Sequence, residues 1–217
     1  MYYYVKDKKF ISEMRGLCGN IMQDLCHLLK EEYDIGAIFY LVGSGAKNLI
    51  MQNENNPIDL DYNLELVRCE LTNCRDIKET VRKAFNRILK EYKFSDCKDS
   101  KSALTTEKRY FTKGNDTEFS IDVAIVYRDD NDNLHRLIHD KTGWTYYDRY
   151  YWVQAPNSRN IREKSSAIKK AGMWENVRTQ YCEIKNRYLY YNDHNHSSFI
   201  CYIEAVNNVY NMLRYFD

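Results

Sequence analysis

The stretch that decides the fold is LVGSGAK at residues 41–47, followed by IDLDY at residues 58–62. An apolar run over residues 37–42 predicts a buried strand, and Gly-Ser-Gly ends this strand where a helix can begin. Main-chain N–H groups that point outward at such a turn favour the binding of a phosphate. The sequence therefore predicts a strand, a phosphate-binding turn and a second strand, in that order.

The second of these stretches contains two carboxylates, Asp59 and Asp61, which are two residues apart. Alternate side chains of a strand point to the same face, so both carboxylates lie on one face while Ile58, Leu60 and Tyr62 lie on the other. Two negative charges side by side disfavour each other's ionised form, and a cation relieves this repulsion. The pattern thus indicates a cation-binding face.

A third carboxylate, Asp122, occurs within the apolar segment EFSIDVAIV at residues 118–126. The alternation of this segment predicts a strand with one apolar face, and Asp122 lies on the opposite face together with Ser120. An ionised carboxylate without a partner is costly in apolar surroundings. Asp122 therefore either pairs with another side chain or binds a metal ion.

Taken in order, Gly43-Ser44, the Asp59-x-Asp61 pair and Asp122 resemble the signature of the nucleotidyltransferase superfamily related to DNA polymerase beta. This family includes poly(A) polymerases, oligoadenylate and cyclic-dinucleotide synthases, aminoglycoside nucleotidyltransferases and several bacterial toxins. The resemblance covers roughly the first 130 residues. It implies an α/β (α+β) fold, a small mixed sheet with flanking helices, followed by a C-terminal helical region. Many members have a small hydroxylated residue just before the carboxylate pair, whereas Pro57-Ile58 precedes it here.

The resemblance also implies a reaction in which Asp59, Asp61 and Asp122 are the metal ligands and the catalytic residues. Two Mg²⁺ ions, with Mn²⁺ as the alternative, would activate an acceptor hydroxyl and hold the triphosphate of ATP or another nucleoside triphosphate. A nucleoside monophosphate would be transferred and pyrophosphate released. The acceptor stays open among a small molecule, tRNA and protein. Two alternatives are ordinary carboxylates on a solvated face and a catalytically inactive nucleotide- or RNA-binding protein with the same fold.

Five residues are candidates for binding the nucleotide. Gly43 lets the main chain approach a phosphate, and Ser44 adds a hydroxyl donor. Three lysines, Lys47, Lys164 and Lys169, are candidates for contacting the triphosphate. The alternative for each lysine is a position on a solvated helix face.

The remaining pattern predicts two domains. Apolar residues at helical spacing predict helices at residues 10–33 and 75–92 around the strands. A short helix is expected at residues 47–51 after the Gly-Ser turn, and a strand at residues 104–111. Three further helices are expected at residues 159–171, 174–190 and 197–215. We therefore expect a nucleotidyltransferase α/β domain at residues 1–150 and a helical subdomain at residues 151–217, with residues 150–158 as the connecting loop.

The composition excludes several classes of protein. The 217 residues are sufficient for a sizeable core, and 14% are aromatic, which disfavours disorder. The net charge of +1 gives no general attraction to nucleic acid or anionic lipid. Seven scattered cysteines without a Cys-x-x-Cys pair disfavour a disulfide framework and a structural zinc site. No apolar window is long enough to span a bilayer, so we expect a soluble, cytoplasmic protein with no membrane contact.

Overall fold

A computed structural model describes residues 1–156, 159–193 and 196–216 of the chain. The chain forms two compact units. The first, here called the sheet unit, comprises Lys6–Lys47 and Asn55–Ala155. The second, the helical unit, comprises Met1–Val5, Asn48–Glu54 and Pro156–Asp217.

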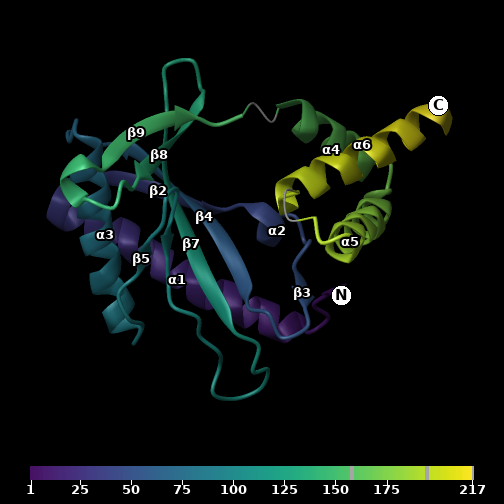
Figure 1. Cartoon of the computed structure of the whole chain (residues 1–217), viewed down its shortest axis with the longest axis horizontal. Helices are drawn as coiled ribbons and strands as arrows, with labels where there is room; N and C mark the ends of the chain where they lie inside the picture. The colour runs from purple at the N-terminus through teal and green to yellow at the C-terminus, as the bar shows by residue number, and fades with distance from the viewer. Residues whose placement is uncertain (157–158, 194–195, 217) are drawn as a thin grey trace. The chain divides into compact units, whose positions relative to one another are not determined.

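The sheet unit is built on a mixed sheet whose centre is a pair of parallel strands (Figure 1). The strand order is β2-β4-β7-β6-β5, and β8 pairs with β7 and with β9. Only β4 and β7 pair in parallel, and the other pairings in this sheet are antiparallel. The strands are β2 Gly36–Leu41, β4 Ile58–Arg68, β5 Lys98–Asp99, β6 Leu104–Thr105, β7 Phe119–Arg128, β8 Leu134–Asp140 and β9 Arg149–Gln154.

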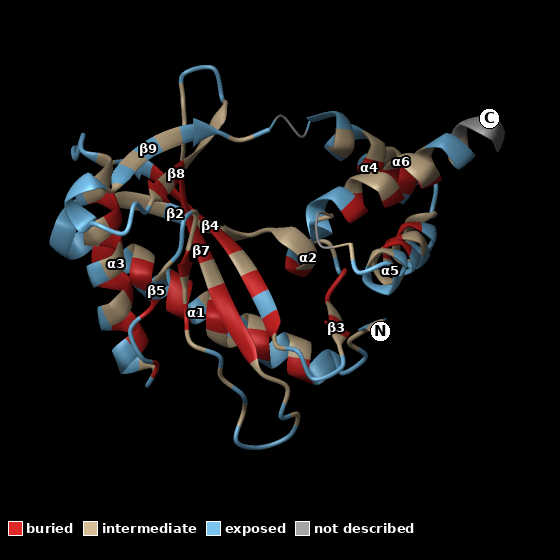
Figure 2. Ribbon diagram, in the orientation of Figure 1, coloured by how far each residue is buried: buried red, intermediate tan, exposed pale blue. Residues whose placement is uncertain are grey.

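Two long helices, α1 (Lys8–Tyr33) and α3 (Cys74–Glu91), cover one face of this sheet (Figure 1). The Phe10 ring of α1 lies 6.4 Å from the Phe119 ring of β7, so α1 packs on the apolar face of the central strands. Figure 2 shows the resulting core as buried segments on both helices and on β4 and β7. Both helices match their predicted ranges within two residues, because their apolar stripes are long and regular.

The helical unit has its own small core. It contains β1 (Tyr2–Tyr4), which pairs with β3 (Met51–Asn53), and the three predicted helices α4 (Arg159–Lys170), α5 (Trp174–Tyr190) and α6 (Ser198–Phe216). The buried residues of this core are Leu49, Ile168, Val177, Tyr181, Ile184, Cys201, Tyr202, Ala205, Val206 and Val209.

The N-terminal strand joins this unit although it begins the chain. The Tyr2 main-chain N–H donates to Asn186 Oδ1 at 2.7 Å, and the Tyr4 hydroxyl donates to the Arg178 carbonyl at 2.7 Å. Met1–Val5 and Asn48–Glu54 therefore belong to the same unit as residues 156–217. The sequence predicted instead that all residues up to 150 belong to the α/β domain.

Three local predictions were wrong. The helix expected over residues 47–51 is instead the short α2 (Gly43–Ala46), and Asn48 follows it with a left-handed φ of 58°. The expected loop over residues 150–158 begins with strand β9, whose Tyr150 ring stacks on His139 at 4.1 Å; residues 157 and 158 lie outside the described part of the chain. The strand expected from Leu104 to Phe111 is limited to β6 and one isolated bridge, Arg109 to Phe119.

Three further features complete the fold. A 3-10 helix, η1, spans Thr145–Tyr147 between β8 and β9. All seven cysteines are free thiols. Within the described ranges, no helix combines the length and the apolar character that crossing a bilayer requires.

Candidate active site

The parallel pairing of β4 with β7 brings the three predicted carboxylates to one face of the sheet. Asp61 is the register partner of Asp122, and Asp59 is the partner of Ser120. Register partners in a sheet project to the same face, which here is the face opposite α1 and α3. The residues between them, Ile58, Leu60, Phe119 and Ile121, are at most 3% exposed on the helix-covered face.

Hydroxyl groups orient two of these carboxylates. The Ser120 hydroxyl donates to Asp59 Oδ1. The Thr105 hydroxyl donates to Asp122 Oδ1 at 2.6 Å, and Thr105 is the register partner of Asp122 on β6. A hydroxyl on a neighbouring strand thus fixes each carboxylate without neutralising its charge.

The Gly43 turn lies directly against the third carboxylate, that of Asp61. The Val42 N–H donates to the Asp61 carbonyl at 2.8 Å, which joins the end of β2 to β4. Gly43 has a φ of +61°, and a Cβ atom there would overlap Asp61 Oδ2 and lie 3.2 Å from its Cγ. Position 43 therefore requires glycine for two reasons, its backbone conformation and the close approach to Asp61.

The other predicted residues of this turn are also at the site. Ser44 lies in α2 next to Gly43. The Lys47 ammonium donates to the Gly43 carbonyl at 3.1 Å and so lies beside the turn. The Arg15 guanidinium of α1 donates to the Gly45 carbonyl at 2.5 Å and anchors the turn from the helix.

The electrostatics of the site disfavour the ionised carboxylates. Burial raises the pKa of Asp61 to about 6, and the charges of Asp122 and Asp59 contribute to the same shift, while Arg136 and Lys47 oppose it. Burial also raises the pKa of Asp122, the Thr105 hydrogen bond lowers it, and the charge of Asp59 raises it. A cation bound here would stabilise the ionised forms of both side chains.

The donor set suits a hard cation that also has ligands from a substrate. No group of three or more His, Cys, Asp or Glu side chains among the described residues is arranged to hold a metal ion by itself. Mg²⁺ is usually bound by only one or two carboxylates, with substrate phosphates and water as the other ligands. The adjacent pair Asp61 and Asp122 fits this mode of binding, and the full three-carboxylate ligand set remains a prediction.

Two predicted nucleotide ligands, Lys164 and Lys169, belong to the helical unit. The Lys164 ammonium donates to Asn207 Oδ1 at 2.7 Å and lies 5.5 Å from the Tyr210 ring centroid. The Lys169 ammonium lies 4.6 Å from the Trp174 ring centroid. These contacts are internal to the helical unit, and a role towards a triphosphate remains a prediction for both lysines.

Sequence reasoning did not identify two further residues at the site, Thr105 and Arg136, and it placed a third, Ser120, only on the face of Asp122. Ser120 was recognisable because it lies two residues before Asp122 and so shares its face. Thr105 was not, since nothing in the sequence gives the register of β6 against β7. Arg136 on β8, a partner of Val126 on β7, lowers the pKa of Asp61 through its charge, and the strand order that brings it there cannot be read from spacing.

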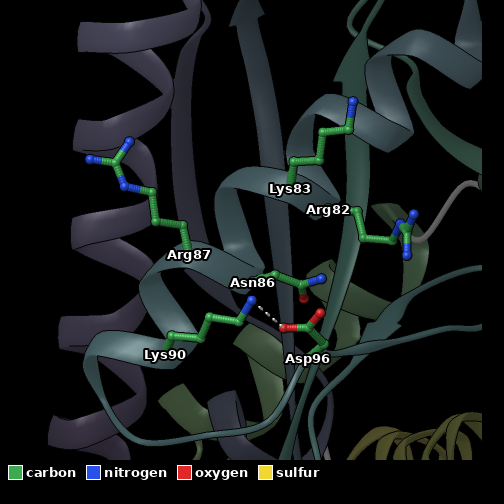
Figure 3. A pocket seen from close by; sticks show the side chains of 6 residues that line it. All are labelled: Arg82, Lys83, Asn86, Arg87, Lys90 and Asp96. Atoms are coloured by element: carbon green, nitrogen blue, oxygen red, sulfur yellow. Dashed lines mark ion pairs between the residues drawn. The ribbon is translucent and has the colours of Figure 1, made fainter.

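A hollow of about 410 Å³ lies on the outer surface of α3 (Figure 3). Its basic side chains are largely neutralised: Arg82 pairs with Glu79 at 2.6 Å, Arg87 with Glu32 at 2.5 Å and Lys90 with Asp96 at 3.2 Å. These ion pairs leave little net charge for an anionic ligand, so the hollow is not a candidate site. The lining residues are Arg82, Lys83, Asn86, Arg87, Lys90 and Asp96.

Comparison with known proteins identifies the fold. No protein-family model and no curated protein matches the sequence. Solved structures do match. E. coli MS115-1 CdnC with ATP has a TM-score of 0.60 at 13% identity, over 95% of this chain and 62% of that chain. Vibrio cholerae DncV cyclic AMP-GMP synthase with the linear intermediate 5' pppA(3',5')pG has a TM-score of 0.59 at 9% identity, over 83% and 62%. Elizabethkingia meningoseptica CdnE cyclic dinucleotide synthase with GTP and Apcpp has a TM-score of 0.53 at 13% identity, over 87% and 68%.

Two of these structures are cyclic dinucleotide synthases, a class that the nucleotidyltransferase superfamily includes, and the chain shares the fold of all three. The predicted fold class, a small mixed sheet with flanking helices and C-terminal helices, is therefore confirmed, as is the resemblance to this superfamily at the level of the fold. The chain spans about three fifths of the length of CdnC and DncV.

Proposed function

We propose that this protein is a metal-dependent nucleotidyltransferase that transfers a nucleoside monophosphate from a nucleoside triphosphate to an acceptor hydroxyl and releases pyrophosphate. The observation that carries the proposal is the pairing of Asp61 with Asp122 in the parallel β4-β7 register, beside a turn where only glycine fits. The comparisons support it because similar folds are bound to ATP and GTP in their solved structures.

Each element of the site has a part in this reaction. The Gly43 turn approaches without a side chain and offers main-chain N–H groups to the triphosphate, and the Ser44 hydroxyl adds a donor. Asp61 and Asp122, with Asp59 beside them, would hold Mg²⁺. When bound, the metal lowers the pKa of the attacking hydroxyl and stabilises the charge on the leaving pyrophosphate. Thr105 and Ser120 keep two of the carboxylates in fixed orientations, and positioning of this kind supplies most of the catalysis in phosphoryl transfer.

We further propose that the acceptor is the ribose hydroxyl of a second nucleotide. Two of the similar structures are synthases of cyclic dinucleotides, and one of them holds a linear dinucleotide triphosphate. The products would then be a linear or cyclic dinucleotide and pyrophosphate. Small molecules, tRNA and protein are the competing acceptors that the experiment must separate from this one.

The test is pyrophosphate release by the purified chain with each of the four nucleoside triphosphates, singly and in pairs, with Mg²⁺ or Mn²⁺. The products are resolved by chromatography and mass spectrometry. We expect release that needs the metal, together with a dinucleotide product. Asp122→Asn and Asp61→Asn should each lower the rate by at least about 10³-fold, as loss of a group that stabilises the transition state does.

The matched control is Asp130→Asn, which neutralises an exposed carboxylate in the turn after β7 and should leave the rate unchanged. Full activity in Asp122→Asn would refute the assigned role. Nucleotide binding without pyrophosphate release under any condition would instead identify a catalytically inactive nucleotide-binding protein.

A further inference from the structure

A buried polar cluster lies in the sheet unit, on the face of the sheet that the helices cover. Lys78 of α3 is only 1% exposed. Its ammonium pairs with Asp99 Oδ1 at 2.6 Å, and the His139 ring links Asp99 to Asp148 through nitrogen-to-oxygen distances of 2.6 and 3.0 Å. Lysine is almost never fully buried unless it is paired, and an apolar residue of similar volume is often at least as stable. A paired lysine at this buried position is therefore a candidate for a positioning role.

The cluster holds one short hairpin, formed by β5, a turn and β6. Three donors reach the main-chain carbonyls of three consecutive residues. Lys141 Nζ donates to the Asp99 carbonyl at 2.5 Å, Lys78 Nζ to the Ser100 carbonyl at 2.9 Å, and the His139 main-chain N–H to the Lys101 carbonyl at 2.7 Å. These donors fix the position of the turn relative to α3 and β8.

The other arm of the same hairpin reaches the candidate active site. The Ser100 and Thr105 hydroxyls are 3.3 Å apart. Thr105 in turn donates its hydroxyl proton to Asp122 at 2.6 Å. A continuous series of contacts therefore runs from Lys78 through Ser100 and Thr105 to the carboxylate.

We propose that Lys78 is a positioning residue, which holds the β5-β6 hairpin so that the Thr105 hydroxyl fixes the Asp122 carboxylate in its working orientation. The inference rests on the proposed function, because it concerns the same site. The Lys78 ammonium donates to the Ser100 carbonyl and forms an ion pair with Asp99, and an apolar residue of the same length could make neither interaction. Without Lys78, the Ser100 carbonyl would lose its buried donor and Asp99 would lose its counter-charge, and the hairpin would shift to reach water.

The role predicts a particular kinetic signature. In the proposed reaction the Gly43 turn would hold the triphosphate, whereas Asp122 would hold the metal that activates the attacking hydroxyl, so a displaced Asp122 carboxylate should lower kcat and leave KM for the triphosphate nearly unchanged. A residue that merely supports the fold would instead lower the amount of active protein. The effect of replacing it would then be independent of a change at Thr105.

The experiment is a double-mutant cycle of Lys78→Met and Thr105→Val, with kcat and KM measured for each variant. We expect each single change to lower kcat by about 10- to 100-fold, as loss of a supporting residue does at metal sites. The double variant should be no worse than Thr105→Val alone, since both changes break the same series of contacts. Losses that multiply, or a normal kcat in Lys78→Met, would overturn the proposal.

The matched control is Lys83→Met on the exposed side of the same helix, where Figure 3 shows this lysine projecting from α3. It should leave kcat unchanged. Thr105→Ser, which restores the hydroxyl, should recover most of the activity that Thr105→Val loses. Should Lys78→Met not fold, Lys141→Met removes another donor to the same turn and should lower kcat in the same direction; an unchanged kcat would count against the proposal.

Amide hydrogen exchange separates this inference from the proposed function. The Ser100 N–H donates to the Ala103 carbonyl and the Thr106 N–H to the Ile121 carbonyl, so both report on the hairpin. Their exchange should become at least about tenfold faster in Lys78→Met and stay unchanged in Lys83→Met. A wild-type chain without any pyrophosphate release would contradict the function, whereas unchanged exchange in Lys78→Met would contradict the inference whatever the activity.

Discussion

Replacing Asp61 by asparagine should abolish the reaction and at the same time stabilise the metal-free protein. The reason is the pKa of Asp61, which rises from its ordinary value of 3.8 to about 6 in the folded chain, mainly through burial and then through the charges of Asp122 and Asp59. A raised carboxyl pKa means that the folded state disfavours the ionised form. Between these two values the folded protein binds more protons than the unfolded one, so its stability falls as the pH rises.

The size of the effect follows from the shift. A change from 3.8 to about 6 is about 2 pKa units, and each unit corresponds to about 1.4 kcal/mol. The full shift would destabilise the folded state by about 3 kcal/mol above pH 6. Asp61 keeps some contact with solvent, so we expect about 2 kcal/mol after screening. The asparagine side chain carries no charge and has nearly the same shape as aspartate, so the variant should recover this free energy.

Urea unfolding of the wild type and of Asp61→Asn, in chelator and at several pH values, measures this difference. The variant should be more stable by about 2 kcal/mol at pH 8, which for a chain of this size raises Tm by about 4–8 °C. The gain should shrink below pH 6 and vanish near pH 4, where the folded protein holds Asp61 protonated and the unfolded chain begins to do so. Asp130→Asn should show no such gain. A variant that is less stable at pH 8, or a difference that does not change with pH, would refute the electrostatic reasoning.

Three further results are expected. Gly43→Ala should weaken triphosphate binding and cost about 1–3 kcal/mol of stability, because alanine is strained at this positive φ and its Cβ would displace the Asp61 carboxylate; calorimetric titration and urea unfolding measure the two effects. Mg²⁺ should raise the Tm of the wild type much more with a non-hydrolysable triphosphate than alone, because phosphates complete the coordination of the metal, and a chelator should reverse the gain. Ser165→Ala should cost about 1–2 kcal/mol in thermal unfolding, because it removes the buried hydrogen bond that joins the Ser165 and Tyr202 hydroxyls at 2.7 Å.

The elements that the sequence predicted well are those with a long, regular apolar pattern. The helices α1, α3, α5 and α6 each extend over 17 residues or more, so many positions agree on one period. Strand β9 was missed because it lies in the stretch that the sequence predicts as a connecting loop, although its alternation between half-buried and exposed positions is that of a strand. The short β6 has only two residues and therefore no period to detect.

For the candidate site, the sequence predicts which residues of one strand share a face, and it does not predict which residues of two strands lie side by side. The spacing of Asp59 and Asp61 gives their shared face, because the side-chain period of a strand is two. The pairing of Asp61 with Asp122 is a property of register, which depends on how the apolar residues of both strands meet the helices. The contact of Gly43 with Asp61 depends on a main-chain approach that spacing does not show. The position of a hydroxyl partner such as Thr105 is set by strand register and by the approach of the main chain, and no local signal in the sequence indicates it.

The register that places the carboxylates is maintained from the other face of the same strands, and this dependence can be tested at Leu60. Leu60 lies between Asp59 and Asp61 in the sequence, and its side chain is fully buried on the opposite face of β4. An ideal Cβ at Gly45 would lie 3.1 Å from Leu60 Cδ2, so this side chain packs against the turn. Leu60→Ala should cost about 2–5 kcal/mol, because it leaves a cavity. It should also weaken triphosphate binding, since the turn loses its support.

Leu89→Ala is the matched control, because Leu89 of α3 is equally buried and the change in chemistry is the same. We expect a similar loss of stability by urea unfolding and no change in triphosphate affinity at a temperature where both variants are folded. Equal losses of affinity in the two variants would mean that the site responds to global stability. Loss of affinity in Leu60→Ala alone would mean that the apolar face of β4 sets the geometry of the carboxylate face, because one strand with a period of two carries both.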